Sequence, residues 1–405
     1  MKAQASTLTG ISDRESSDEA RLTRFFLQYS KKISKPNTRD ADDILTFIER
    51  FVTDCIAINE PGYHLIIKRS GRKDFIATKL GKVYFEQING FLNAYNAGYF
   101  YSPNIALFFN VAQELKLLNH RFMSLSDMND QGVTDAELFN LLIQRIQEKG
   151  RTPQHKKKVE RNQTLSSKRF ISLVNYVDAL FEYVRSRLII IRLDIEYTRA
   201  SFQAMKPGQA QKDLRRFFGR MRSKPDLFND LVGYIWKLER SRNGGEHFHL
   251  MLFFNNDTFR NDAYLAEKVG GHWQETVPLG CGTYFSCHRA DHKAKQTKLS
   301  IGRIDYHNDT KRHYLLDSLA YLCKTNQSLL VKPKRSSRRY GRGEMPPERA
   351  VKMGRPRSVA VPPRAYLALI DKAFDHEAIK GGQSVRTLSR SNSVNRPVVS
   401  GGCLV

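Results

Sequence analysis

Apolar residues recur at helical spacing between residues 21 and 150. Ile44, Phe47, Ile48 and Phe51 follow the i, i+3, i+4, i+7 rule, which indicates an amphipathic helix. A second helix begins at Thr134, where Thr134 and Glu137 have the spacing of a capping box. After this start, the predicted buried stripe and the glycine that ends the helix are Leu138, Leu141, Leu142, Ile146 and Gly150.

Other segments within and beside this region lack the helical pattern. Residues 1–20 are rich in Ser and Thr and have no apolar period, which predicts a disordered tail. Residues 63–68 and 79–84 are candidate strands of a small hairpin. Residues 151–168 are polar and basic with few large apolar groups, which is typical of a linker. Residues 21–150 are thus predicted to form a mainly helical N-terminal domain, whose sequence indicates no particular role.

The pattern changes after residue 168. Helical spacing over 170–184 is followed by strict alternation of apolar and charged residues over 191–197, which predicts a strand. Residues 232–239 and 247–254 read as two further strands around a turn that contains Asn and Gly. Helical spacing returns at 262–269 and at 313–324. This mixture predicts an α+β domain over 169–330, with an antiparallel sheet and flanking helices.

The last segment of the chain, 331–405, has another composition. Between residues 331 and 357 it contains ten Lys or Arg and two Glu, together with four Pro and three Gly. A packed fold is not expected from such a composition. We therefore predict a basic, largely flexible C-terminal extension, with a weak helix over 365–374.

Composition narrows the class of protein. The 405 residues include 66 Lys and Arg against 41 Asp and Glu, which gives a formal net charge of +25. This surplus favours a polyanionic partner such as nucleic acid, although a basic surface that is merely solvated is the alternative. The sequence has no apolar run long enough for a membrane span, no secretory signal and no Walker A loop. We therefore expect a cytoplasmic protein that does not contact membranes.

The most informative segment contains Glu239 and the pair His247 and His249. Residues two apart on a strand share a face, so the two imidazoles lie side by side while Phe248 points to the other face. Imidazoles are good ligands for divalent metals. Glu239 lies opposite His247 if the loop has an odd number of residues, as in a three-residue turn over 242–244 with its glycine in the left-handed region. Taken alone, a His-x-His pair is explained equally well by a hydrogen-bonded edge strand.

A later helix supplies a candidate nucleophile. Tyr321 and Lys324 are three residues apart in the helical segment 313–324 and therefore share a face. A tyrosine hydroxyl beside a cation, close to a metal that polarises a phosphate, is suited to attack on a phosphodiester. Without the histidine pair, the same residues would be an ordinary half-buried helix surface. The residues available to pack inward are Leu315, Leu316, Leu319 and Leu322.

Together these motifs resemble the HUH endonuclease superfamily, which has His-hydrophobic-His on a strand, a preceding acidic residue, and Tyr-x-x-Lys on a later helix. Further landmarks are similar to the inovirus Gp2 family, also called the YagK/YfjJ type, which occurs in filamentous phages and prophages. These landmarks are Gly233, Tyr234, Trp236, Glu239, Gly245, Trp273 and the segment 301–304. The resemblance covers residues 168–335 and does not extend to residues 1–150.

The resemblance implies an HUH-like nicking domain that initiates rolling-circle replication. Tyr321 would become joined to the 5′ phosphate of single-stranded origin DNA and leave a 3′-OH for a host polymerase, with a host helicase as a further partner. Lys324 would offset charge in the transition state. The ligands of the Mg²⁺ or Mn²⁺ cofactor would be Glu239, His247 and His249.

The number of nucleophiles is also open. Many phage initiators have two tyrosines four residues apart, but position 317 here is Asp, so a single nucleophile is expected. Tyr314 lies two helical turns before Tyr321 and is the alternative second nucleophile.

Candidate DNA contacts follow directly after the proposed nucleophile. Basic residues of the extension would follow the phosphates of a single strand, and Tyr340 would stack on a base. The basic residues are Lys332, Lys334, Arg335, Arg338, Arg339 and Arg342. Arg192, Asp194 and Glu196 share one strand face. That face either flanks the metal and DNA, with Arg192 as a DNA contact, or is solvated.

Two other functions are compatible with the same sequence. One is a relaxase or single-tyrosine transposase with the same site. The other is a non-catalytic DNA-binding regulatory protein that keeps the fold and binds DNA without a metal. The sequence does not determine the oligomeric state or the origin that would be recognised.

Overall fold

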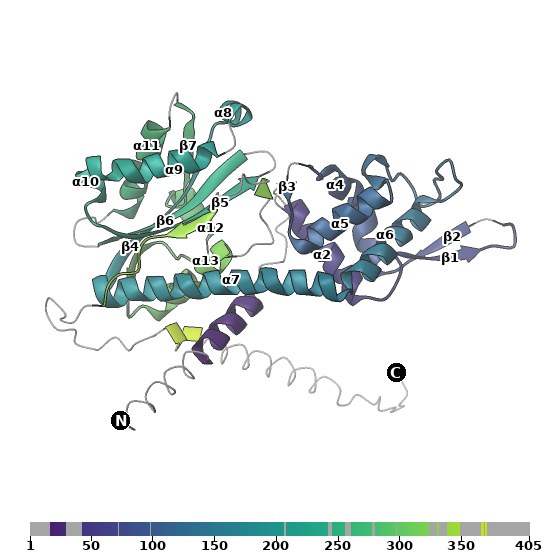
Figure 1. Ribbon diagram of the computed structural model, residues 1–405, viewed down its shortest axis with the longest axis horizontal. Helices are drawn as coiled ribbons and strands as arrows, with labels where there is room; N and C mark the ends of the chain where they lie inside the picture. The colour runs from purple at the N-terminus through teal and green to yellow at the C-terminus, as the bar shows by residue number, and fades with distance from the viewer. Residues whose placement is uncertain are drawn as a thin grey trace, which may run out of the picture.

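One long helix, α7 (Pro153–Ala179), joins a helical N-terminal body to a body built on a six-stranded sheet (Figure 1). The computed structural model describes residues 17–29, 43–71, 73–97, 99–205, 208–241, 245–255, 261–277, 280–296, 298–323, 330–331, 338–348, 366–367 and 369–370. Within this described part, no helix is both long and apolar enough to cross a membrane.

The N-terminal body is organised by aromatic packing. Phe51, Phe108 and Phe139 are fully buried and in ring contact, and they bring three helices around one core. These helices are α2 (Asp43–Ala57), α5 (Pro103–Glu114) and α6 (Asp135–Gly150). Shorter elements complete the body: α3 (Lys79–Tyr84), η1 (Phe85–Gln87), α4 (Ile88–Asn93) and η2 (Leu117–Asn119).

The start of α6 has the predicted capping box. The Thr134 hydroxyl accepts a hydrogen bond from the Glu137 N–H, and the Glu137 carboxylate accepts one from the Thr134 N–H. The buried stripe of α6 is rotated from the predicted one, because Leu138 and Leu141 are only partly buried. Its core-facing residues are Ala136, Phe139, Leu142, Ile143 and Ile146.

The predicted hairpin exists but has a different second strand. β1 (Tyr63–Ile67) pairs in antiparallel register with β2 (Lys73–Ala77). Residues 79–84, predicted as a strand, form helix α3 instead. The reason is the cap at Thr78, whose hydroxyl accepts hydrogen bonds from the N–H groups of Leu80 and Gly81 and so starts a helix there.

The segment predicted as a linker, 151–168, is mostly the first half of α7. Thr152 caps the helix and Pro153 occupies its first turn, which favours a helix start. Its Lys, Gln, Glu and Arg residues are good helix formers. They show no apolar stripe because most of this stretch is exposed, with His155 buried against Asn104 of α5. The two bodies are therefore connected by a continuous helix.

A helix at residues 17–29 corrects the predicted limits of the tail and of the N-terminal domain. Its first residues, 17–20, were expected to be part of a disordered tail. Its buried residues Leu22, Phe25 and Phe26 pack in the same cluster as Phe170 of α7, and both Phe25 and Phe26 stack on Phe170. This N-terminal helix therefore belongs to the core of the sheet body.

The sheet confirms the predicted α+β class. Its strand order is β10-β5-β6-β4-β7, with β8 also pairing with β4, and every pairing is antiparallel. β4 is the centre of this arrangement because it pairs with three other strands. The strands are β4 (Arg187–Tyr197), β5 (Leu231–Ser241), β6 (Gly245–Asn255), β7 (Gly282–Ser286), β8 (Gly302–Asp305) and β10 (Tyr340–Arg342).

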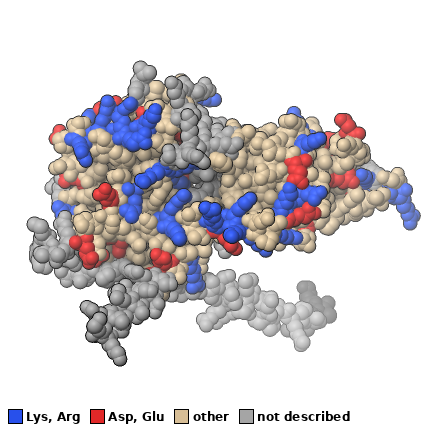
Figure 2. Space-filling view, in the orientation of Figure 1, with Lys and Arg blue, Asp and Glu red and all other residues tan. Residues whose placement is uncertain are grey.

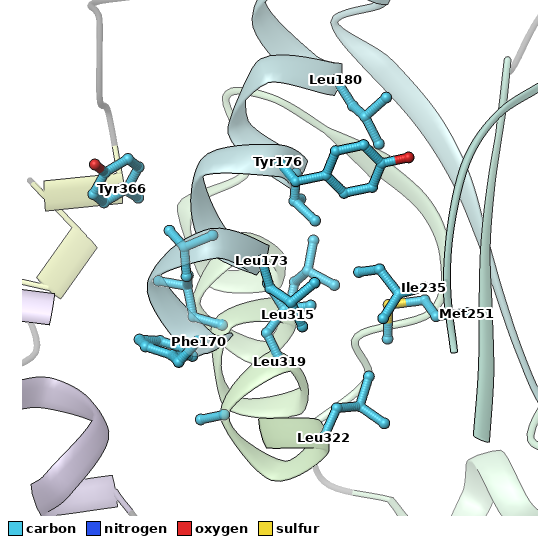
Figure 3. Close-up of a cluster of buried hydrophobic side chains, with 14 of the residues drawn as sticks. Phe170, Leu173, Tyr176, Leu180, Ile235, Met251, Leu315, Leu319, Leu322 and Tyr366 are labelled. Carbon is cyan, nitrogen blue, oxygen red and sulfur yellow. The ribbon is translucent and has the colours of Figure 1, made fainter. Parts of the chain in front are cut away.

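Helices cover both faces of the sheet. On one face, Phe217 of α9 (Gln209–Arg220) and Trp273 of α11 (Asp262–Thr276) pack on Phe248 and its neighbours. On the other face, side chains of α7 and α13 (Asp309–Cys323) meet Ile235 and Met251 of the sheet (Figure 3). The remaining short elements of this body are η3 (Leu180–Val184), α8 (Arg199–Ala204), η4 (Met221–Ser223), α10 (Pro225–Phe228) and α12 (Ala290–Lys295).

Parts of the C-terminal extension are structured, contrary to the expectation of a largely flexible segment. Tyr340–Arg342 form the edge strand β10, and β9 (Leu330–Val331) pairs with β3 (Tyr99–Phe100) of the N-terminal body. Further on, buried residues of the extension pack in the cluster that contains α7 and α13: Tyr366, Leu369 and Ile370. These three apolar residues lie beyond the basic stretch 331–357 and bury the apolar surface that the stretch itself does not offer. Residues 332–337, 349–365 and 371–405 lie outside the described part.

Candidate active site

The hairpin of β5 and β6 has the register that the sequence predicted. Glu239 is paired with His247, and Ser241 is paired with Gly245, so three residues separate the paired ends. Gly245 has φ of +80°, which favours glycine. The predicted left-handed residue, Gly244, lies outside the described residues.

The three predicted ligands come together on one face of this hairpin. The Nε2 atom of His249 lies 2.9 Å from Oε2 of Glu239, and Nε2 of His247 lies 3.9 Å from the same oxygen. One possible ligand atom from each of the three residues lies within 4.8 Å of the others. Two ligands of one transition-metal ion are at most about 4.4 Å apart, since each bond is about 2.0–2.2 Å long. Small side-chain movements would therefore let this donor set hold a divalent ion.

Asp194 completes the surroundings of His249. The register pairs Asp194 of β4 with His249 of β6, and Nδ1 of His249 donates to Oδ1 of Asp194 over 2.6 Å. A carboxylate at one imidazole nitrogen fixes the ring and the tautomer, which leaves the other nitrogen for a metal. Asp194 therefore acts on His249 as the supporting carboxylate of a metal-binding histidine would.

Lys237 occupies the other side of His249. It pairs with His249 in the sheet register, is 8% exposed, and forms a close ion pair with Oε1 of Glu239. A row of charged residues thus crosses three adjacent strands in the order Lys237, His249, Asp194. Without a metal, the Glu239 carboxylate lies between the two cations of this row, Lys237 and His249.

The cluster strongly shifts the pKa values of its members. Burial lowers the pKa of His249, but Asp194 and Glu239 outweigh burial and raise the pKa to about 9. Burial raises the pKa of Glu239, but Lys237 and His249 hold it well below its ordinary range. His249 is therefore protonated at neutral pH in the metal-free protein, and a metal at its Nε2 atom would displace a proton.

Tyr321 lies directly beside this cluster. Helix α13 lies over the apolar part of the same sheet face and carries Tyr321 in its last turn. The Tyr321 ring centroid is 6.4 Å from that of His249, with the two rings inclined at 74°. The guanidinium carbon of Arg192 lies 5.5 Å from the Tyr321 centroid, which places a cation beside the tyrosine. Lys324, the predicted cation, lies outside the described residues.

Helix α13 is held in place by contacts along its length. Arg312 donates to Asp178 of α7 over 2.5 Å, in a pair that is buried on both sides. Nearer to Tyr321, Lys298 contacts Asp317 at 3.2 Å. The predicted inward leucines of α13 are buried as expected: Leu315, Leu316, Leu319 and Leu322. These contacts fix where the tyrosine meets the sheet.

Tyr29 brings the N-terminal helix to the same place. Its ring stacks on Phe25, which in turn contacts His313 of α13 edge to face. Burial raises the pKa of Tyr29, and the nearby Asp317 raises it further. Arg192 and Tyr321 also lie within electrostatic range of the Tyr29 hydroxyl. The end of this helix therefore borders the tyrosine site.

The predicted DNA-contacting residues differ in how far they are buried in the structure. Tyr340 packs against the core of the sheet body, and Arg342 lies over the Tyr176 ring of α7 with its Nε atom donating to Ser172. Arg339 is half-buried and Arg338 is exposed. Arg192 lies at Tyr321, as described above. Three of the predicted contacts lie outside the described residues: Lys332, Lys334 and Arg335.

Sequence reasoning missed the roles of three residues. Lys237 is two positions before Glu239, so the strand period alone places both on one face. Asp194 was expected only as part of a strand face that either flanks the metal and DNA or is solvated, because its pairing with His249 depends on the register between two residues 55 positions apart. Tyr29 had no sequence signal, since only the packing of the N-terminal helix brings it to α13.

The fold and the site define an α+β domain whose sheet presents a Glu/His/His cluster to a tyrosine on the covering helix. Residues 148–343 match the family model of the YagK/YfjJ C-terminal domain. The match runs from the end of α6 through β10 and contains the whole cluster and Tyr321. It confirms the YagK/YfjJ part of the resemblance noted in the sequence. No curated protein and no solved structure gives a significant match to the chain.

Proposed function

We propose that this chain is a metal-dependent DNA-nicking enzyme, a replication initiator of the inovirus Gp2 type with an HUH-like site. The observation that carries the proposal is the placement of Tyr321 beside His249, within reach of a donor set suited to a divalent metal. The net charge of +25 supports a nucleic acid as the substrate. The YagK/YfjJ match is consistent with a prophage-borne protein.

Each residue has a definite task in this proposal. Glu239, His247 and His249 would hold Mg²⁺ or Mn²⁺, which when bound would polarise the scissile phosphate. The Tyr321 oxygen forms a bond to phosphorus and the bond from phosphorus to the 3′ oxygen breaks. The phenol gives up its proton to solvent, and the departing 3′ oxygen takes one from solvent. The products are a 5′-phosphotyrosine linkage and a free 3′-OH.

Positive charge around Tyr321 favours this reaction. Arg192 lies against the tyrosine ring, where it would stabilise negative charge that develops on the phenol oxygen and the phosphate. Asp194 keeps His249 in the orientation that directs Nε2 toward Glu239. Strand register and helix packing fix the positions of these groups, so that metal binding calls for side-chain movements and the loss of the His249 proton.

Covalent trapping of DNA tests the proposal. The full chain is incubated with Mn²⁺ and random-sequence single-stranded oligonucleotides, labelled at the 5′ end in one reaction and at the 3′ end in another. A 5′-phosphotyrosine product carries the 3′ label into a protein band on a denaturing gel and leaves the 5′ label on free DNA. The expected result is an adduct that needs Mn²⁺ and is lost in Tyr321→Phe.

Tyr314→Phe is the matched control because it removes the other tyrosine hydroxyl of α13, seven residues earlier. It is expected to keep the adduct. Equal labelling of wild type and Tyr321→Phe, or a 5′-label adduct, would contradict the mechanism. Loss in Tyr314→Phe with retention in Tyr321→Phe would assign the attack to Tyr314.

A second function has one specific observation in its favour. The charges of Glu239, Lys237, His249 and Asp194 neutralise one another without an ion. Such a closed network would suit a non-catalytic DNA-binding regulator. That function predicts DNA binding that needs no divalent ion and is unchanged in His247→Ala, together with no covalent adduct under any condition.

A further inference from the structure

The β1–β2 hairpin projects from the N-terminal body, away from the sheet body (Figure 1). Its base is firmly attached: Tyr63 and Phe75 pack with the core of that body. At the outer end of the strand ladder, Lys73, which pairs with Ile67, donates to both carboxylate oxygens of Glu137 on α6, over 2.8 and 2.9 Å. The hairpin is therefore a fixed arm whose outer part extends into solvent.

The outer part of this arm exposes large apolar side chains. Ile66 and Ile76 lie on the same face of the hairpin and are 43% and 55% exposed, and Ile67 on the opposite face is 67% exposed. Isolated two-stranded hairpins are marginally stable, and clustered exposed apolar side chains are a mark of interaction sites. The projecting ribbon thus has the features of a contact surface.

The tip of the arm is basic. Residues 68–74 contain four cations, Lys68, Arg69, Arg72 and Lys73, and a single acid, Asp74, so their formal net charge is 4 − 1 = +3, of which the charge of Lys73 is paired with Glu137 of α6. Lys68 and Arg69 are exposed. Figure 2 shows Lys and Arg side chains gathered at this end of the molecule. A partner that meets both the tip and the ribbon therefore has to combine negative charge with an apolar surface.

We propose that the β1–β2 hairpin is an arm that binds duplex DNA. The major groove of DNA admits a two-stranded β-ribbon, and its thymine methyl groups offer apolar contacts to side chains such as Ile66 and Ile76. Phosphates on either side of the groove would be met by Lys68 and Arg69. The arm would hold double-stranded DNA at the end of the molecule away from the Tyr321 site, and its binding does not depend on the nicking activity.

Binding to labelled duplex DNA, measured by fluorescence anisotropy across a range of salt concentrations, tests the cationic part. Lys68→Ala/Arg69→Ala in the full chain is expected to bind roughly tenfold more weakly at moderate salt, with a salt slope lower by about 2. Lys82→Ala/Arg121→Ala removes two exposed cations of the same body that do not belong to the hairpin, and it is expected to change both quantities much less. Asp74→Asn should have the opposite sign and tighten binding, because it releases Lys68 from its ion pair.

The apolar part is tested with Ile66→Ser/Ile76→Ser, whose exposed side chains are not needed for the core. Weaker duplex binding with an unchanged salt slope is expected. Sedimentation of the wild type and this variant provides the second readout. A wild type that self-associates through these isoleucines, with DNA binding equal in both proteins, would make a second copy of the chain the occupant and overturn the proposal.

The other outcomes are equally decisive. Absence of duplex binding by the wild type, or equal effects of the hairpin and control pairs, would also overturn it. Adduct formation on single-stranded oligonucleotides should remain unchanged in the hairpin variants. Tyr321→Phe should bind duplex DNA as the wild type does. Failure of the arm and failure of the nicking site are therefore distinguished.

Discussion

Asp194 accepts a hydrogen bond from Nδ1 of His249 at 2.6 Å, on the side of the imidazole ring opposite to Glu239. This contact joins β4 to the hairpin that carries all three candidate ligands. It makes the orientation of His249 depend on a residue of a different strand, far away in the sequence.

Asp194→Asn should weaken Mn²⁺ binding about 10- to 100-fold, because the amide no longer fixes the tautomer that directs Nε2 to the metal. Titration calorimetry with Mn²⁺ measures the change. Asp262→Asn is the matched control, since Asp262 contacts Nδ1 of His288 at the same 2.6 Å and neither residue is a candidate metal ligand. Equal losses in the two variants would indicate a general disturbance of the fold.

Lys237→Met should have the opposite effect on metal binding. The ammonium group of Lys237 competes with a metal for Glu239, so its removal leaves a buried carboxylate that an ion can neutralise. We expect lower stability of the metal-free variant and a larger rise in melting temperature on addition of Mn²⁺ than in wild type. A smaller rise than in wild type would show that Lys237 supports the ligand set.

Phe26→Ala should destabilise the sheet body by about 3–5 kcal/mol, because the fully buried ring stacks on Phe170 of α7. Hydrogen exchange should then become faster in α7 and α13, while α2, α5 and α6 keep their protection. Phe139→Ala, in the other core, is expected to give the reverse pattern. Faster exchange only in the N-terminal body of Phe26→Ala would show that the N-terminal helix does not stabilise the sheet body.

Glu137 should make the stability of the N-terminal body sensitive to acid. Burial disfavours its ionised form, but hydrogen bonds from Lys73 and Thr134 lower its pKa from 4.5 to about 2. A depressed folded-state pKa stabilises the fold above pH 4.5, and this stabilisation is lost as the pH falls toward 2. We expect it to be about 2 kcal/mol after allowance for solvent screening. Denaturant unfolding of wild type and Glu137→Gln across this range measures it, and parallel pH profiles would contradict the assignment.

The sequence was most informative where interactions are local. The capping box at Thr134 and the pairing of Glu239 with His247 depend on residues only a few positions apart, and both were predicted. The strand predicted at 79–84 was wrong because Thr78 caps a helix there, a local signal that the apolar pattern obscured. The linker prediction failed because an exposed helix such as the first half of α7 has no apolar stripe to reveal it.

By itself, the sequence determined the α+β class of the sheet body, the face shared by His247 and His249, and the tyrosine helix. These follow from the two-residue period of a strand and the helical repeat, which any window of the chain displays. Only the tertiary structure decided that Asp194 and Lys237 flank His249, that Arg192 lies on Tyr321, and that Tyr29 borders the same site. Strand register between distant segments and helix docking depend on the burial of whole surfaces, and no short stretch of sequence encodes that burial.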